Sequence, residues 1–247
     1  YTVYLTNNSS SSGFEPVFNM YGGEVYNGAM SYSHAVHLGQ NGTYLYEINV
    51  WGGTITSKYQ DGICATASSG ANTLIAGGTV TGVHQAVSVL GNLTLAGSPT
   101  LNHTAESGRD INITTISTAA TDNDYVLVAD DFAPASGTAL SVAKTASKLG
   151  RCFAKSEGGE SLQDKVRYFV SANEGYFVKC DTDGNLYLTE CAITEQPTKG
   201  NRYTVSAKGT PDYQWWSTKR GNVSVTSERA TAGDFSYYAA RGEWTYF

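Results

Sequence analysis

Charged side chains are scarce in this chain of 247 residues. Asp, Glu, Lys and Arg together make up 15% of it, against roughly 25% in an average soluble domain. Lys and Arg number 16 and Asp and Glu number 22, so the formal net charge is −6. Proteins that bind nucleic acids or anionic membrane surfaces draw on dense Lys and Arg patches. We therefore expect no nucleic-acid partner.

Long apolar runs are absent as well. No run of about 18 apolar residues occurs, so we expect no membrane insertion in this fragment. The chain begins at Tyr1 and lacks the basic stretch followed by an apolar stretch that marks a secretory signal. We expect a mature or excised fragment whose signal is missing.

The four cysteines form no metal-binding motif. Cys64, Cys152, Cys180 and Cys191 contain no C-x-x-C spacing, so we expect no structural zinc site and no cofactor. Cys180 and Cys191 flank a segment that can fold back as a hairpin. They are either bridged or two separate thiols packed as small apolar side chains.

Internal repeats organise the first part of the chain. Four segments have the form of a short strand that meets a Gly-Gly pair or its Gly-Ser equivalent, at residues 18–25, 48–55, 73–80 and 93–99. A second set of strand-like segments falls between them. Its leading apolar positions, spaced by 33, 27, 24 and 24 residues, are Val3, Val36, Ile63, Val87 and Ile111.

These repeats predict a solenoid. Each holds two or three strands of about four residues, which are too short to bury a face alone and must stack on their neighbours. The i, i+3, i+4 periodicity of helical repeats is absent. The fold class that we predict is all-β: a right-handed parallel β-helix (solenoid) in which each strand pairs with its equivalent one coil along, with a C-terminal β cap and a short Ig-like β segment.

Three regions follow from this pattern. Residues 1–113 are expected to form the parallel coils, and residues 114–190 the final coil and a β-rich cap, because a solenoid edge needs cover. Within the second region we predict a buried strand at 124–129, an irregular or weakly helical stretch at 139–149 and a hairpin turn at Asp183-Gly184. Residues 191–247 form the third region.

The third region resembles the opening of a bacterial immunoglobulin-like domain. An I-T-x-Q-P linker at residues 193–197 precedes a Tyr-Gln-Trp-Trp strand at residues 213–216. In such domains the first Trp of this strand lies in the core, which leaves Trp216 on the opposite face. Only about 55 residues remain, against roughly 100 in the complete fold, so we expect a truncated or divergent Ig-like segment.

The coils themselves resemble a known group of proteins. The strand-Gly-Gly-Thr-Val/Ile units, LTLAGSP at residues 93–99, DINI at 110–113 and NLYL at 185–188 are similar to the β-helix repeats of large surface-anchored proteins of gut Firmicutes. The resemblance covers roughly residues 1 to 190. It implies a solenoid fold, an adhesin-like role and an extracellular location, at the cell surface or secreted. It transfers no catalytic motif.

Aromatic residues are the strongest candidates for binding. Tyr21 and Trp51 occupy equivalent places just before the Gly pairs of successive coils. Outward rings would stack into a ligand platform, whereas inward rings would fill the core in one column with Ala76 and Ala96. We favour the inward orientation.

Histidines provide a second candidate site. His34 and His37 are three residues apart around a strand, which places them on opposite faces and argues against a shared metal ion. His34, Asp61, Gln85 and Arg109 precede the leading apolar positions by two residues in successive coils, so His34 and Asp61 are expected to be stacked neighbours. A His and Asp pair suits general-base chemistry. No G-x-S-x-G motif accompanies it, and we favour solvated polar stacking.

Carboxylates offer little support for an enzyme. Glycosidases need two carboxyl groups about 5 to 9.5 Å apart across a sugar. The densest carboxylates are Asp122, Asp124, Asp130 and Asp131. Adjacent residues on a strand point to opposite faces, and the Asp122 and Asp124 pair lacks a nearby Arg or Lys. The segment 181–185 has oxygen ligands in a calcium-loop pattern, but an Asp-Gly hairpin turn is the favoured interpretation.

The sequence therefore predicts a non-catalytic, extracellular, adhesin-like ligand-binding or display region of a bacterial cell-surface protein. We expect a monomer whose partner is a host or dietary glycan, or a host surface protein. Loops at residues 7–14 and 40–46 project from the coils, and Tyr44, Tyr46 and Trp216 are the predicted ligand-binding residues. A carbohydrate-active β-helix enzyme, either a polysaccharide lyase or a glycoside hydrolase, is the alternative, and a passive structural stalk is another.

Overall fold

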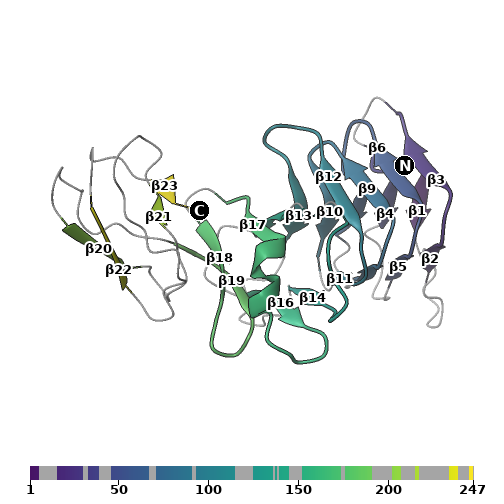
Figure 1. The fold of residues 1–247 in the computed structure, drawn as a ribbon. Helices are drawn as coiled ribbons and strands as arrows, with labels where there is room; N and C mark the ends of the chain where they lie inside the picture. Colours follow the sequence, from purple (N-terminus) through teal and green to yellow (C-terminus); the bar gives the residue numbers. More distant parts are fainter. Residues whose placement is uncertain are drawn as a thin grey trace.

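The structure is a computed structural model whose described part is almost entirely β-structure (Figure 1). The described residues are 1–5, 16–29, 33–38, 46–66, 71–90, 93–114, 125–135, 137, 139–144, 152–173 and 176–190, with four further strands within 202–246. Among them no helix is both long and apolar enough to cross a membrane.

Three sheets run along the molecule, and successive strands of the chain enter them in turn. Sheet A contains β1 (Val3–Leu5), β4 (Val36–Leu38), β7 (Ile63–Ala65), β10 (Gln85–Val89), β13 (Arg109–Ile113), β15 (Leu140–Lys144) and β17 (Phe169–Ser171). Sheet B contains β2 (Val17–Met20), β5 (Tyr46–Val50), β8 (Ala71–Ile75), β11 (Leu93–Leu95), β14 (Val126–Val128), β16 (Cys152–Ser156), β19 (Leu186–Glu190) and β18 (Tyr176–Cys180). Sheet C contains β3 (Glu24–Asn27), β6 (Thr54–Ser57), β9 (Thr79–Gly82) and β12 (Thr100–His103).

The pairing between coils confirms the predicted parallel β-solenoid. The leading apolar positions are direct partners in sheet A, in the order Val3, Val36, Ile63, Val87 and Ile111. The side chains from Val36 to Ile111 in this column are fully buried. Because strands alternate inward and outward side chains, equal registers in stacked coils give one continuous apolar interior.

Glycine pairs make the corner between sheets B and C. The second glycine of each pair has a positive φ, +83° at Gly23, +89° at Gly53 and +75° at Gly78, which side chains with a Cβ rarely adopt. The first glycine meets the coil before it: a Cβ on Gly52 would lie 2.6 Å from the carbonyl oxygen of Tyr21. The corner therefore lets successive coils approach closely.

Parallel coils continue beyond residue 113. β15 pairs in parallel with both β13 and β17, and β14 pairs in parallel with β16. The predicted irregular or weakly helical stretch at 139–149 is wrong for Leu140–Lys144, which form β15. Leu140 and Val142 point into the core, as alternate residues of a strand do. In the sequence this alternation covers too few residues to distinguish a strand from a loop. Sheet C has no described strand beyond β12.

A hairpin covers the end of sheet B. β18 and β19 pair antiparallel, and β19 also pairs antiparallel with β16. The predicted Asp183-Gly184 turn is confirmed, since Gly184 has φ +83° and its N–H donates to the Asp181 carbonyl at 3.2 Å. The Asp181 carboxylate accepts the N–H groups of Asp183 and Asn185 at 3.0 and 2.8 Å, so it stabilises this turn. A short 3₁₀ helix, η2 (Gln163–Tyr168), lies before β17.

The last described strands form two antiparallel pairs, β20 (Arg202–Ser206) with β22 (Asp234–Tyr238) and β21 (Trp215–Trp216) with β23 (Thr245–Tyr246). An Ig-like arrangement of this region stays a prediction. Cys191 lies outside the described residues, so the proposed bridge to Cys180 also stays a prediction.

Candidate functional site

Tyr21 and Trp51 form an exposed aromatic stack on the solenoid. Tyr21 is 74% exposed and Trp51 40% exposed, and their ring centroids are 4.7 Å apart with an interplanar angle of 6°. The favoured inward orientation is therefore wrong. Met20 and Val50 directly precede the two aromatics and already occupy the core. Alternation then turns the following residue outward.

The stack ends abruptly along its column. The next coils place Ala76 and Ala96 at the equivalent positions, as the backbone N–H of each donates to the carbonyl of Val50 and Ile75 respectively. Each of these positions carries only a methyl group. The face of Trp51 opposite Tyr21 is therefore not stacked against a large side chain from its own column.

Polar side chains lie beside this stack, two residues earlier on the outward face of sheet B. Asn19 and Asn49 are register partners, and the Asn49 amide donates to Asn19 Oδ1 at 3.0 Å. Glu47 lies on β5 two residues before Asn49, and it is the register partner of the exposed Asn72 on β8 of the next coil. We call the surface made by Tyr21, Trp51, Asn19 and Asn49 the aromatic corner.

The predicted ligand-binding residues do not form this corner. Tyr46 lies on β5 with its side chain fully buried, so it is a core residue and its assignment to ligand binding is corrected. Tyr44 and the loop at 7–14 lie outside the described residues. Trp216 is placed on β21, but its side chain is not described. The apolar residue just before Tyr21 and Trp51 was the signal that could have identified the exposed pair.

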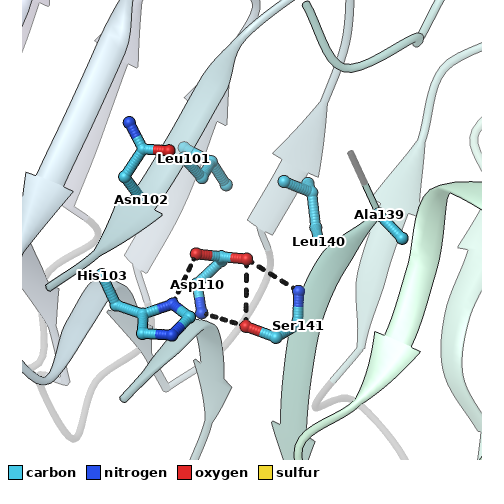
Figure 2. A pocket seen from close by; sticks show the side chains of 7 residues that line it. All are labelled: Leu101, Asn102, His103, Asp110, Ala139, Leu140 and Ser141. Atoms are coloured by element: carbon cyan, nitrogen blue, oxygen red, sulfur yellow. Dashed lines mark hydrogen bonds and ion pairs between the residues drawn. The ribbon is translucent and has the colours of Figure 1, made fainter. Parts of the chain in front are cut away.

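A pocket of about 250 Å³ opens beside the last strand of sheet C (Figure 2). Its lining residues come from β12, β13, β15 and the residue just before β15, and they are Leu101, Asn102, His103, Asp110, Ala139, Leu140 and Ser141. β12 is the last described strand of sheet C, and His103 stands at its end.

Hydrogen bonds hold the polar side of the pocket together, as Figure 2 shows. His103 Nδ1 lies 2.8 Å from Asp110 Oδ1. Asp110 Oδ2 accepts the backbone N–H of Ser141 at 2.8 Å and its hydroxyl at 3.0 Å. The Ser141 hydroxyl thus donates to Asp110, not to His103, which does not match a Ser-His nucleophile. Among the described lining residues Asp110 supplies the one carboxyl group, whereas glycosidases need two.

The predicted stacking of His34 and Asp61 beside β4 is confirmed, but the expectation that the pair is solvated is wrong, because Asp61 is buried. His34 Nδ1 lies 3.4 Å from Asp61 Oδ2, and Gln85 and Arg109 are register partners. With its amide nitrogen facing the carboxylate, Gln85 donates to both Asp61 oxygens at 2.6 and 3.0 Å. Burial is the main cause that raises the pKa of Asp61 to about 6. Burial, with His37 second, lowers the pKa of His34 to about 4. Near neutral pH, His34 is therefore uncharged and Asp61 is ionised.

His34 and His37 lie on the same side of the chain, contrary to the prediction of opposite faces. Their ring centroids are 5.1 Å apart and nearly parallel. Strand alternation applies only from Val36, where β4 begins, and a bend at Ala35 places two successive buried residues between the histidines. Both rings consequently face outward, where the His37 ring stacks on Tyr1 and Tyr4 and the His34 ring on Tyr1.

The carboxylates considered for sugar hydrolysis are not gathered in a described cleft. Asp130 and Asp131 are exposed, and Asp131 accepts the backbone N–H of Gly97 at 3.1 Å. Asp122 and Asp124 lie outside the described residues.

Comparisons of the chain with protein-family models, with curated proteins and with solved structures find no match. The resemblance to surface proteins of gut Firmicutes stays a prediction.

Proposed function

We propose that the protein is a non-catalytic, extracellular carbohydrate-binding region of a bacterial surface protein, and that the aromatic corner is its binding surface. The single observation that carries this proposal is the exposed Tyr21 and Trp51 stack, with centroids 4.7 Å apart. A glycan chain of host or dietary origin is the proposed partner.

The chemistry of the corner supports a sugar ligand. The face of an aromatic ring carries partial negative charge and attracts the C–H groups on the flat side of a pyranose. The Asn19 and Asn49 amides lie beside the rings and offer hydrogen bonds to sugar hydroxyls. A rigid solenoid fixes both kinds of group in advance, which lowers the entropy lost on binding.

The described pocket gives weaker support to an enzyme. Its described lining presents one carboxyl group, and the backbone N–H and the hydroxyl of Ser141 both donate to that carboxylate, the one of Asp110. A passive stalk has no need of large exposed rings, and the ring surface that stays exposed after Tyr21 and Trp51 stack gains free energy only when a ligand covers it.

Binding to an array of mucin-type and plant glycans tests the proposal. We expect retention of at least one glycan class by the wild type and a loss of roughly thirtyfold in affinity in Trp51→Ala, as for an aromatic hot spot worth about 2 kcal/mol. Tyr26→Ala is the matched control, because Tyr26 is 51% exposed on β3 but belongs to sheet C. Silence across the array, or equal binding by Trp51→Ala and the wild type, would contradict the proposal.

A further inference from the structure

Three metal-ligating side chains meet on the outer face of sheet A, away from the aromatic corner. His34 lies just before β4, His37 lies within β4, and Cys64 is the register partner of His37 on β7. One ligand atom from each residue lies within 4.8 Å of the other two. Sequence spacing concealed this cluster, because Cys64 reaches the histidines only through the stacking of two coils.

The ring nitrogens and the sulfur of this cluster make few hydrogen bonds to the described residues. Nδ1 of His34 and Nδ1 of His37 are buried and have no hydrogen-bond partner among the described residues. Cys64 is 6% exposed, and the Thr66 hydroxyl lies 3.4 Å from its sulfur. A buried imidazole nitrogen without a partner lowers stability. At His37 a metal that accepts the Nδ1 lone pair would reverse this, and at His34 a hydrogen bond from Nδ1–H to Asp61, 3.4 Å away, would do so.

The donor set selects the kind of metal. Two imidazole nitrogens and one thiolate sulfur are ligands of zinc and related transition metals, whereas calcium and magnesium require oxygen. We propose that His34, His37 and Cys64 bind a zinc ion and leave its fourth position to water or to an incoming ligand. Cys64 binds as the thiolate and releases its proton to solvent.

A second row of residues supports this arrangement. Asp61 Oδ2 lies 3.4 Å from His34 Nδ1, and Gln85 donates two hydrogen bonds to the Asp61 carboxylate. A carboxylate behind a histidine fixes the ring orientation and raises the basicity of the nitrogen that faces the metal. His34 would then bind zinc through Nε2 while Nδ1–H donates to Asp61.

Metal binding needs a small local adjustment. Zinc lies about 2.0–2.3 Å from its ligands, so tetrahedral ligand atoms are roughly 3.3–3.8 Å apart. The cluster must therefore close from a spacing of up to 4.8 Å, with the two stacked imidazoles turning out of their parallel arrangement. The His37 ring also stacks on the exposed Tyr1 ring, with centroids 4.3 Å apart, so Tyr1 must move with it.

Cobalt titration of the chelator-treated protein provides the test. We expect one equivalent of Co²⁺ to bind with a thiolate-to-cobalt charge-transfer absorption band, and Zn²⁺ to abolish this band by competition. The band should be absent in Cys64→Ser. Affinity for Zn²⁺ should fall at least hundredfold in His37→Ala, and about 10- to 100-fold in Asp61→Asn, which removes only the supporting carboxylate.

His84→Ala is the matched control, because His84 is exposed and lies outside the cluster. Circular dichroism reports the fold of each variant. If Cys64→Ser does not fold, His37→Ala still tests the site, because His37 is partly exposed and its replacement disturbs the core less. No thiolate band in the wild type, unchanged affinity in His37→Ala, or an equal loss in His84→Ala would overturn the zinc site. None of these results bears on glycan binding by Trp51.

Discussion

The ring of Trp51 stacks on the ring of Tyr21, and the glycine that follows Trp51 packs against the backbone carbonyl of Tyr21 in the previous coil. Gly52 meets the Tyr21 carbonyl oxygen, and Gly77 meets that of Trp51 in the same way. A side chain at either glycine would push the coils apart. The glycine corner and the aromatic stack are therefore one structural unit.

Replacing Gly77 by alanine should destabilise the protein by about 1–3 kcal/mol, since the new methyl group overlaps the Trp51 carbonyl. Gly22 provides the matched control, because nothing lies within 4 Å of a Cβ placed there. We expect Gly22→Ala to change the free energy of unfolding by less than about 0.5 kcal/mol. Urea unfolding measures both variants, and an equal effect of the two substitutions would contradict the stacked corner.

Thr73→Val should stabilise the protein. Thr73 is 2% exposed on β8, and its hydroxyl oxygen has no hydrogen-bond partner among the described residues. Valine keeps the branched shape and removes the buried polar group, which is worth about 1 kcal/mol. Thr94→Val is the control, because Thr94 points outward on β11. A loss of stability in Thr73→Val on thermal or urea unfolding would show that the hydroxyl is hydrogen-bonded.

The register of the coils could be read from the sequence, because it depends on apolar residues at equivalent positions. The equivalence of Val3, Val36, Ile63, Val87 and Ile111 placed His34 beside Asp61, as the structure has them. This inference needed two assumptions: that each leading apolar residue is buried, and that the side chains on either side of it point alternately outward and inward.

The sequence did not reveal one departure from alternation and two aromatic orientations. The bend at Ala35 brings His37 to the same side of the chain as His34, and no residue pattern in the sequence indicated this bend. The inward orientation of Tyr46 and the outward orientation of Tyr21 were both misjudged, since an aromatic residue suits a core and a surface alike. The pocket beside His103 is lined by residues of three strands, β12, β13 and β15, and by Ala139, so it depends on how the coils stack.

Alkaline pH should destabilise the end of the solenoid. Cys152 on β16 faces Tyr187 on β19, and burial is the main cause that raises the pKa of Cys152 from 9.0 to about 11 and the pKa of Tyr187 from 10.0 to about 12. The native state holds these protons more tightly than the unfolded state. The stability present below pH 9 is therefore lost as the pH rises through 11 and toward 12.

Cys152→Ala should flatten the dependence of the unfolding free energy on pH between 9 and 11, the window in which only the unfolded thiol ionises. Urea unfolding at a series of pH values measures it. Tyr187→Phe is the companion variant, and its effect should begin about one pH unit higher. An alkaline loss as steep in Cys152→Ala as in the wild type would contradict this cause.

Asp110 should be a structural residue. The residue is 7% exposed, and its carboxylate accepts hydrogen bonds from both the backbone N–H and the hydroxyl of Ser141. Asp110→Ala leaves these buried donors without an acceptor and should lower the free energy of unfolding by about 2–3 kcal/mol. Asp130→Ala changes an exposed carboxylate and is the control. A stability of Asp110→Ala equal to that of Asp130→Ala in urea would point to a role in chemistry for Asp110.

The central claim is that the aromatic corner binds a glycan and leaves it intact. Its most direct test is to incubate a retained oligosaccharide with the protein, measure binding by calorimetry and analyse the recovered ligand by mass. The account predicts full-length oligosaccharide, bound by the wild type and by His103→Ala alike and lost in Trp51→Ala. Shortened products that disappear in His103→Ala, or binding that survives Trp51→Ala, would contradict it.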